Sequence, residues 1–181
     1  MTKDSAERES EGTQSGGAVV EELVNPIAQL PGYDDTESRI GIWGHPLHAM
    51  SVSFPVALTF CAFGADGLYW LSGEPFWARA AIWAAGTAFL FGLLAGLTGM
   101  AEMALVRGIR VRAAVWTHFV IAVFLLSALG ANWGYRLTGW ETAVLPYGIL
   151  LSGFNVLAVI ATGWHGGALV FDHRLGTSKG S

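Results

Sequence analysis

The stretch AAIWAAGTAFLFGLLAGLTGMA, residues 80–101, decides the fold, because it contains no charged side chain. A helix needs ~20 consecutive, mostly apolar residues to cross ~30 Å of hydrocarbon. Three further runs meet this requirement, and each holds a single charged or histidine side chain: 49–71 with Asp66, 113–133 with His118 and 147–170 with His165. Inside a bilayer such runs can satisfy their backbone hydrogen bonds only as helices, and short connectors make neighbouring helices antiparallel. The sequence therefore predicts an all-α integral membrane protein, an up-down bundle of four transmembrane helices.

The composition supports a membrane protein and divides the chain into three parts. Of the 181 residues, 52% are hydrophobic and 13% are charged, and the mean hydropathy is +0.46. Residues 1–40 hold nine acidic and three basic residues, which leaves this segment with a net charge of −6. We expect a disordered N-terminal tail over 1–40, the transmembrane domain over 41–176 and a short C-terminal tail over 177–181. This charge pattern excludes nucleic acid as a partner. Cys61, the only cysteine, excludes an internal disulfide and a thiolate metal cluster.

The basic residues predict the orientation of the bundle. One end of the predicted helices carries Arg39, Arg107, Arg110, Arg112, Arg174 and Lys179, whereas the other end carries only Arg79 and Arg136. Basic residues near helix ends concentrate on the cytoplasmic side of a membrane. We therefore expect both termini and the loop at 104–112 to be cytoplasmic.

All five histidines fall toward that same end of the bundle. His45 and His48 begin the first helix, His118 lies five residues inside the third, and His165 and His173 lie at the end of the fourth. If the turn around Pro46 is helical, the i,i+3 spacing places the first two imidazoles on one side. Glu102 reaches the same end from the second helix.

This cluster has two interpretations. The simpler one is a set of interfacial imidazoles that only form hydrogen bonds. The other is a site for a metal or cofactor, since ionisable groups at membrane depth are costly and usually functional. Histidine with glutamate and without cysteine suits zinc, copper or iron, and histidines from different helices also hold the iron of haem b. Gly92, Gly96 and Gly99 share one face of the second helix, either for close helix packing or as a wall for a planar ring. Asp66 is expected to bond with Asn132, Arg136 or Asn155.

Three stretches resemble the bacterial membrane proteins grouped as domain of unknown function 2231. They are GHPLHAM at 44–50 with Phe54 and Pro55, the histidine at 118, and GWHGGALVFDH at 163–173, which together frame residues 43–176. The resemblance implies a four-helix domain of the bacterial inner membrane. Relatives fused to Rieske iron–sulfur or c-type cytochrome domains imply an electron-transfer setting. The recurring histidines of that family correspond to His45, His48, His118 and His173, while the position of His165 is more often apolar.

The preferred interpretation is a membrane redox subunit that relays electrons between a partner protein and the quinone pool. His118 would bind haem b together with His173 or with one of the pair His45 and His48, and the propionates would face Arg107, Arg110 and Arg112. A second interpretation is a divalent-metal or proton-coupled transport module whose ligands come from His45, His48, Glu102, His118, His165 and His173, and which would need a homo-oligomer. A third is a non-catalytic membrane anchor. No motif of an enzyme acting alone is present.

Overall fold

The computed structural model describes residues 27–171 and residue 175. The elements in chain order are β1 (Gly41–Ile42), β2 (His45–Pro46), α2 (Leu47–Ser51), α3 (Ser53–Ser72), α4 (Pro75–Leu105), α5 (Arg107–Arg110), α6 (Ala113–Arg136), the π-helix η1 (Val144–Gly148) and α7 (Ile149–Phe171). Within this part of the chain, four helical stretches are long and apolar enough to span a membrane: Leu47–Ser72, Pro75–Leu105, Ala113–Arg136 and Val144–Phe171. The prediction of a four-helix membrane protein is confirmed.

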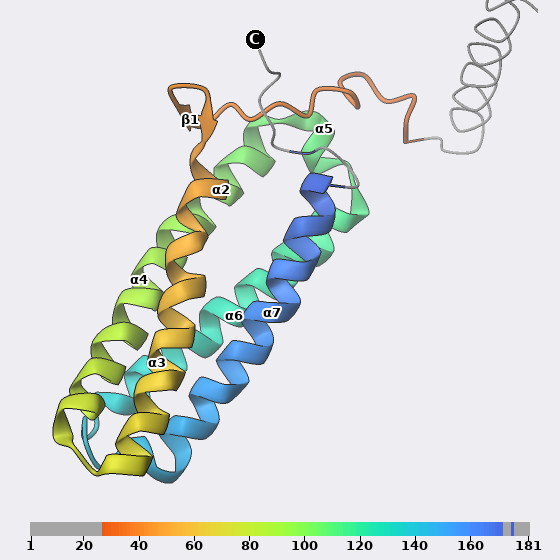
Figure 1. The fold of residues 1–181 in the computed structure, drawn as a ribbon. Helices are drawn as coiled ribbons and strands as arrows, with labels where there is room; N and C mark the ends of the chain where they lie inside the picture. Colours follow the sequence, from red (N-terminus) through yellow and green to blue (C-terminus); the bar gives the residue numbers. More distant parts are fainter. Residues whose placement is uncertain (1–26, 172–174, 176–181) are drawn as a thin grey trace, which may run out of the picture.

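The four spans form a ring in which each helix contacts two others. α3 contacts α4 and α7, and α6 contacts the same two helices. Figure 1 shows that the α2–α3–α4 side and the α6–α7 side move apart toward the end that carries α5. The helix backbones are therefore closer together at one end than at the end where the histidines lie.

Small side chains line the inside of the bundle, and large apolar ones face outward. The buried positions of α3 and α4 include Ala62, Ala65, Ala78, Ala81, Ala85, Ala88 and Ala95, whereas Phe60, Leu90 and Leu97 are exposed. Lipid tails solvate outward-facing leucine and phenylalanine, and small residues let helix backbones approach closely. This inverted arrangement fits a bilayer as the surrounding solvent.

Two prolines mark where helices begin or break. The first span is interrupted at Val52, between α2 and α3. Pro55 lies three residues later and has no amide hydrogen, so it cannot donate the backbone hydrogen bond that would join the two helices regularly. Pro75 opens α4 at its first position, where a missing amide hydrogen costs nothing. The second span consequently extends beyond both ends of the apolar run at 80–101.

Residues 27–40, the last part of the predicted N-terminal tail, contact the transmembrane bundle. This segment crosses the α5 end of the bundle (Figure 1) and bonds to it. The backbone amides of Arg39 and Ile40 donate to Glu102, and the Arg112 guanidinium lies over the Tyr33 ring, 4.1 Å from its centroid. The bonding partners of this segment lie far along the chain. Residues 1–26 of the predicted tail and the tail at 177–181 lie outside the described residues.

Candidate functional site

His48 is held by the backbone of the neighbouring helix. Its Nδ1 lies 2.8 Å from the carbonyl oxygen of Ala95 on α4. A carbonyl oxygen only accepts hydrogen bonds, so in the neutral ring Nδ1 carries the proton and Nε2 keeps the lone pair. The ring packs on Gly99, where an added Cβ would lie 2.8 Å from both Cε1 and Nδ1. The missing side chain of Gly99 therefore makes room for His48.

His118 occupies the corresponding place on the other side of the bundle. Its ring packs on Gly166 of α7, where an added Cβ would lie 3.0 Å from Cε1. Its Nδ1 is buried and has no hydrogen-bond partner within the described part of the chain. Buried polar nitrogens without partners are rare in native structures, so this nitrogen needs an explanation.

His118 lies close enough to His48 and to His165 for its charge to interact with theirs. His48 lies on α2 and contacts α4, whereas His118 lies on α6 and contacts α7. His165, on α7, is exposed. The structure thus brings together three of the five histidines, and His173 lies outside the described residues.

His45 does not join this group, because the helix begins two residues later than the sequence pattern suggested. Pro46 disfavours helical backbone at the residue before it, and His45 instead pairs with Ile42 in the β1–β2 hairpin. The turn of this hairpin, Trp43–Gly44, has positive φ at both residues, and the exposed His45 ring bonds to the Trp43 carbonyl at 3.0 Å. The expected i,i+3 pair of imidazoles is therefore not formed.

Glu102 holds the N-terminal segment rather than facing the histidines. Oε1 accepts from the Ile40 amide at 2.8 Å and from the Ser38 hydroxyl, and Oε2 accepts from the Arg39 amide at 3.1 Å. Both carboxylate oxygens are occupied by residues that precede the first helix. Across the described residues, no group of three or more histidine, cysteine, aspartate or glutamate side chains is arranged to hold a metal ion.

The three loop arginines lie at this end of the bundle in different environments. Arg112 donates to the carbonyls of Gly108 and Tyr33, so it fastens the N-terminal segment. Arg110 is exposed and donates to the Ala104 carbonyl, while exposed Arg107 lays its aliphatic stem near Gly32.

The opposite end of the bundle holds a buried polar network. The Arg136 guanidinium forms two hydrogen bonds with the Asp66 carboxylate, at 2.8 and 2.6 Å, and both side chains are fully buried. Arg136 also donates to Asn132 and Ser152. The predicted partnership of Asp66 with Arg136 is confirmed, and this network ties α3, α6 and α7 together.

Sequence reasoning missed the features that position the histidine rings. The Ala95 carbonyl is a backbone group and carries no signal in the sequence. Gly99 was noticed in the glycine stripe of the second helix, but its two companions have another role: Gly92 and Gly96 pack against Leu126 of α6. The Gly166 position beside a histidine was the available signal for the other contact.

Comparisons with known proteins agree with this architecture. Residues 44–179, most of the chain, match the family described as "Predicted membrane protein (DUF2231)". No curated protein and no solved structure matches the chain. The matched region contains all four spans and leaves out the N-terminal segment at 27–40. The match confirms the resemblance seen in the sequence. The chain therefore belongs to the DUF2231 family of membrane proteins.

Proposed function

We propose that this protein is a membrane electron-transfer subunit in which His48 and His118 would hold haem b between the two sides of the bundle. The observation that carries the proposal is the hydrogen bond from Nδ1 of His48 to the Ala95 carbonyl. A backbone carbonyl that binds one ring nitrogen fixes the tautomer and leaves the other nitrogen available for a metal, which is the usual outer-shell arrangement of metal-binding histidines.

The surroundings of both rings support haem better than a bare metal ion. Two imidazoles from separate helices would be enough to hold haem iron, whereas zinc sites in proteins use three or four protein ligands. Glu102 already binds the N-terminal segment, and His45 lies in the hairpin. These placements argue against the metal-transport alternative, and Gly99 and Gly166 give each ring a bare surface on the adjacent helix.

Haem b would supply reversible one-electron chemistry at iron, and the chain would supply its position and environment. The Ala95 carbonyl orients the His48 ring, and Gly166 sets the position of the His118 ring. Exposed Arg107 and Arg110 carry positive charge at the same end, where they would balance anionic propionates. The segment 27–40 covers this end of the bundle and would limit access of water.

We further propose that the histidine end faces the cytoplasm of a bacterial inner membrane and that the electron partners are a second protein and quinone. The distribution of positive charge between the two ends of the bundle supports this orientation. Arg107, Arg110 and Arg112 lie at the histidine end, whereas Arg136 at the other end is neutralised by Asp66. Arg79 is then the remaining basic charge of the described residues at that end, which strengthens the asymmetry expected for a membrane protein.

The decisive measurement is the reduced-minus-oxidised absorption spectrum of the purified protein, with metal analysis of the same sample. We expect a Soret band and a dithionite-dependent α band that are lost in His48→Ala and His118→Ala and kept in His45→Ala. Loss of the bands in His165→Ala or His173→Ala, with His48→Ala unaffected, would replace the proposed ligand pair. Stoichiometric zinc or copper without colour would instead favour the metal site, and neither signal would favour a plain anchor.

Glycine variants test the geometry without removing a ligand. Gly99→Ala places a methyl group 2.8 Å from the His48 ring, whereas at Gly96 an added Cβ meets only Leu126, at 3.9 Å. Gly166→Ala presses on His118, whereas Gly163→Ala meets nothing within 4 Å. We expect the first member of each pair to lower the haem content per protein and the second to leave it unchanged.

A further inference from the structure

A groove lies between α4 and α6 at the end of the bundle opposite the histidines. Its volume is about 340 Å³, within the range of small-molecule sites in proteins. α4 contributes Trp83 and Leu90 to the walls, α6 contributes Trp133, and Leu137 and Trp140 follow α6. Both helices are candidate membrane spans, so the groove opens toward lipid.

The depth of the groove depends on Gly86. An added Cβ there would lie 2.6 Å from Nε1 of Trp133, so the indole can rest against the α4 backbone only because residue 86 has no side chain. Trp83, at the rim of the groove, is 75% exposed and therefore faces the bilayer. The result is an open groove with aromatic walls along α4, rather than a closed contact between the two helices.

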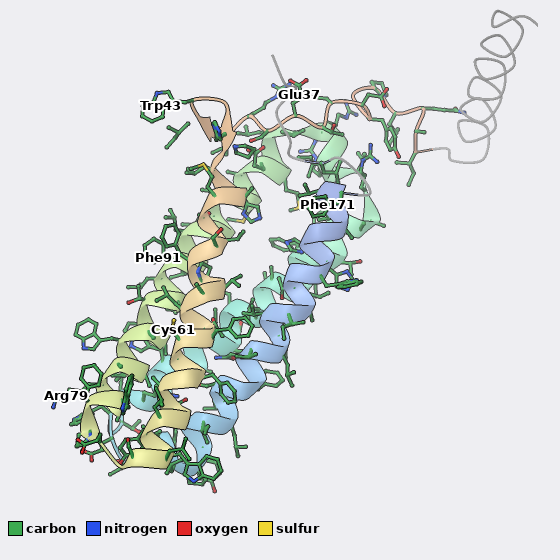
Figure 2. All side chains as sticks on the ribbon, in the orientation of Figure 1. Glu37, Trp43, Cys61, Arg79, Phe91 and Phe171 are labelled. Carbon is green, nitrogen blue, oxygen red and sulfur yellow. The ribbon has the colours of Figure 1, made fainter. Side chains whose placement is uncertain are left out.

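Arg79 is the charged residue among those that line this groove, and Figure 2 shows it at the end of the bundle opposite α5. Its guanidinium carbon lies 5.3 Å from the ring centroid of Trp140, and among residues 27–171 no carboxylate forms an ion pair with it. Arg79 lies in the second turn of α4, and Leu90 follows 11 residues later, about 16 Å along the helix. A cation at the membrane surface is thus followed by an apolar track that runs into the hydrocarbon.

We propose that this groove, lined by Arg79, Trp83, Leu90, Trp133, Leu137 and Trp140, binds an anionic phospholipid. The phosphate would pair with Arg79, and one acyl chain would lie along the aromatic track. A neutral quinone would leave the charge of Arg79 without a counterpart, and a zwitterionic lipid would compensate it only in part. The proposal is independent of haem, because the groove and the histidines lie at opposite ends of the bundle.

Binding of phosphatidylglycerol and phosphatidylcholine to the delipidated, full-length protein tests this proposal, with native mass spectrometry as the readout. We expect the protein to prefer phosphatidylglycerol, and Arg79→Gln to weaken its binding about fivefold, the effect of one basic residue near a membrane surface. Arg39→Gln, which removes an exposed arginine at the other end, should have no effect. Trp83→Ala should weaken both lipids, whereas Trp164→Ala, at an 80% exposed tryptophan on α7, should weaken neither.

Three results would overturn the assignment. Equal binding of the two lipids would show an apolar surface that does not recognise the lipid headgroup. Unchanged phosphatidylglycerol binding by Arg79→Gln would remove the proposed phosphate contact. Displacement of phosphatidylglycerol by a short-chain ubiquinone would assign the groove to quinone.

Discussion

Asn155 is a buried amide with neither of its polar atoms in a hydrogen bond inside the described part of the chain. It lies on α7, three residues after Ser152, which belongs to the Asp66–Arg136 network. An unsatisfied buried polar group costs about 1–3 kcal/mol. Asn155 therefore reduces stability, whereas leucine, which has the same branching and the same number of side-chain heavy atoms, would leave no polar atom without a partner.

We expect Asn155→Leu to raise the unfolding free energy by about 1 kcal/mol or more, because it removes a polar group without partners. Thermal unfolding in detergent provides the measurement. Asn132→Leu is the matched control, since Asn132 is equally buried but bonds to Arg136 and Ser152, and this variant should be less stable than the wild type. A loss of stability in Asn155→Leu would mean that the amide has a partner such as an internal water molecule.

The ion pair of Asp66 and Arg136 leads to a prediction about single and double variants. Removing one partner of a buried pair leaves an uncompensated charge and costs about 3–5 kcal/mol. We expect Asp66→Leu to unfold at a much lower temperature than the wild type, and Asp66→Leu with Arg136→Leu to recover part of the loss. If the double variant were less stable than the single one, the hydrogen bonds of Arg136 to Asn132 and Ser152 would outweigh its charge.

At the scale of elements, Glu102 joins the end of α4 to the segment that precedes the first span. Three donors from residues 38–40 converge on its carboxylate. Gly108 contributes a second attachment, because an added Cβ would lie 2.3 Å from the Asp35 carbonyl oxygen. The segment is thus fixed to α4 and to α5 at separate points.

Glu102→Gln should loosen this segment, since an amide offers one acceptor oxygen and turns a donor group toward the remaining amides. We expect trypsin to cut after Arg39 several times faster than in the wild type, as measured by mass spectrometry of the fragments. Glu74→Gln, at an exposed residue of the opposite end, is the control. Equal cleavage rates for Glu102→Gln and the wild type would mean that the other contacts of the segment hold it alone.

The elements themselves were largely predictable, because each span contains a mostly apolar run of sufficient length. The limits of α4 were not, because Arg79 and Glu102 continue the helix beyond the apolar run at both ends. The hairpin at His45 was foreseeable from Pro46, which restricts the residue before it. The attachment of residues 27–40 was not, because its contacts join residues 62 to 79 positions apart and local composition carries no information about them.

The candidate site was likewise predictable only in part. The end of the bundle and the residue types were visible in the sequence, since every histidine lies near the same end of its span. The choice among the histidines depended on the helix pairing, which places His48 against α4 and His118 against α7. Backbone acceptors such as the Ala95 carbonyl are chemically identical at every position, so only three-dimensional structure distinguishes them.

At the scale of the whole molecule, the asymmetry of charge leads to a test of orientation. In a Cys61→Ala background, Asp34→Cys marks the histidine end and Thr138→Cys marks the other, and both positions are exposed. We expect a membrane-impermeant maleimide to label only Thr138→Cys in bacterial spheroplasts and both variants after lysis. Labelling of Asp34→Cys in intact spheroplasts would reverse the proposed orientation.

The length of α4 sets how the whole molecule meets its bilayer. Its 31 residues extend about 46 Å, but the charge-free run at 80–101 extends about 33 Å, slightly more than the ~30 Å of hydrocarbon in a typical membrane. Such hydrophobic mismatch is relieved by tilting, and a thinner membrane demands more tilt. Because Glu102 near the end of this helix binds residues 38–40, we expect a change of tilt to move that segment as well. Membrane thickness should therefore affect how residues 38–40 are positioned at the histidine end of the protein.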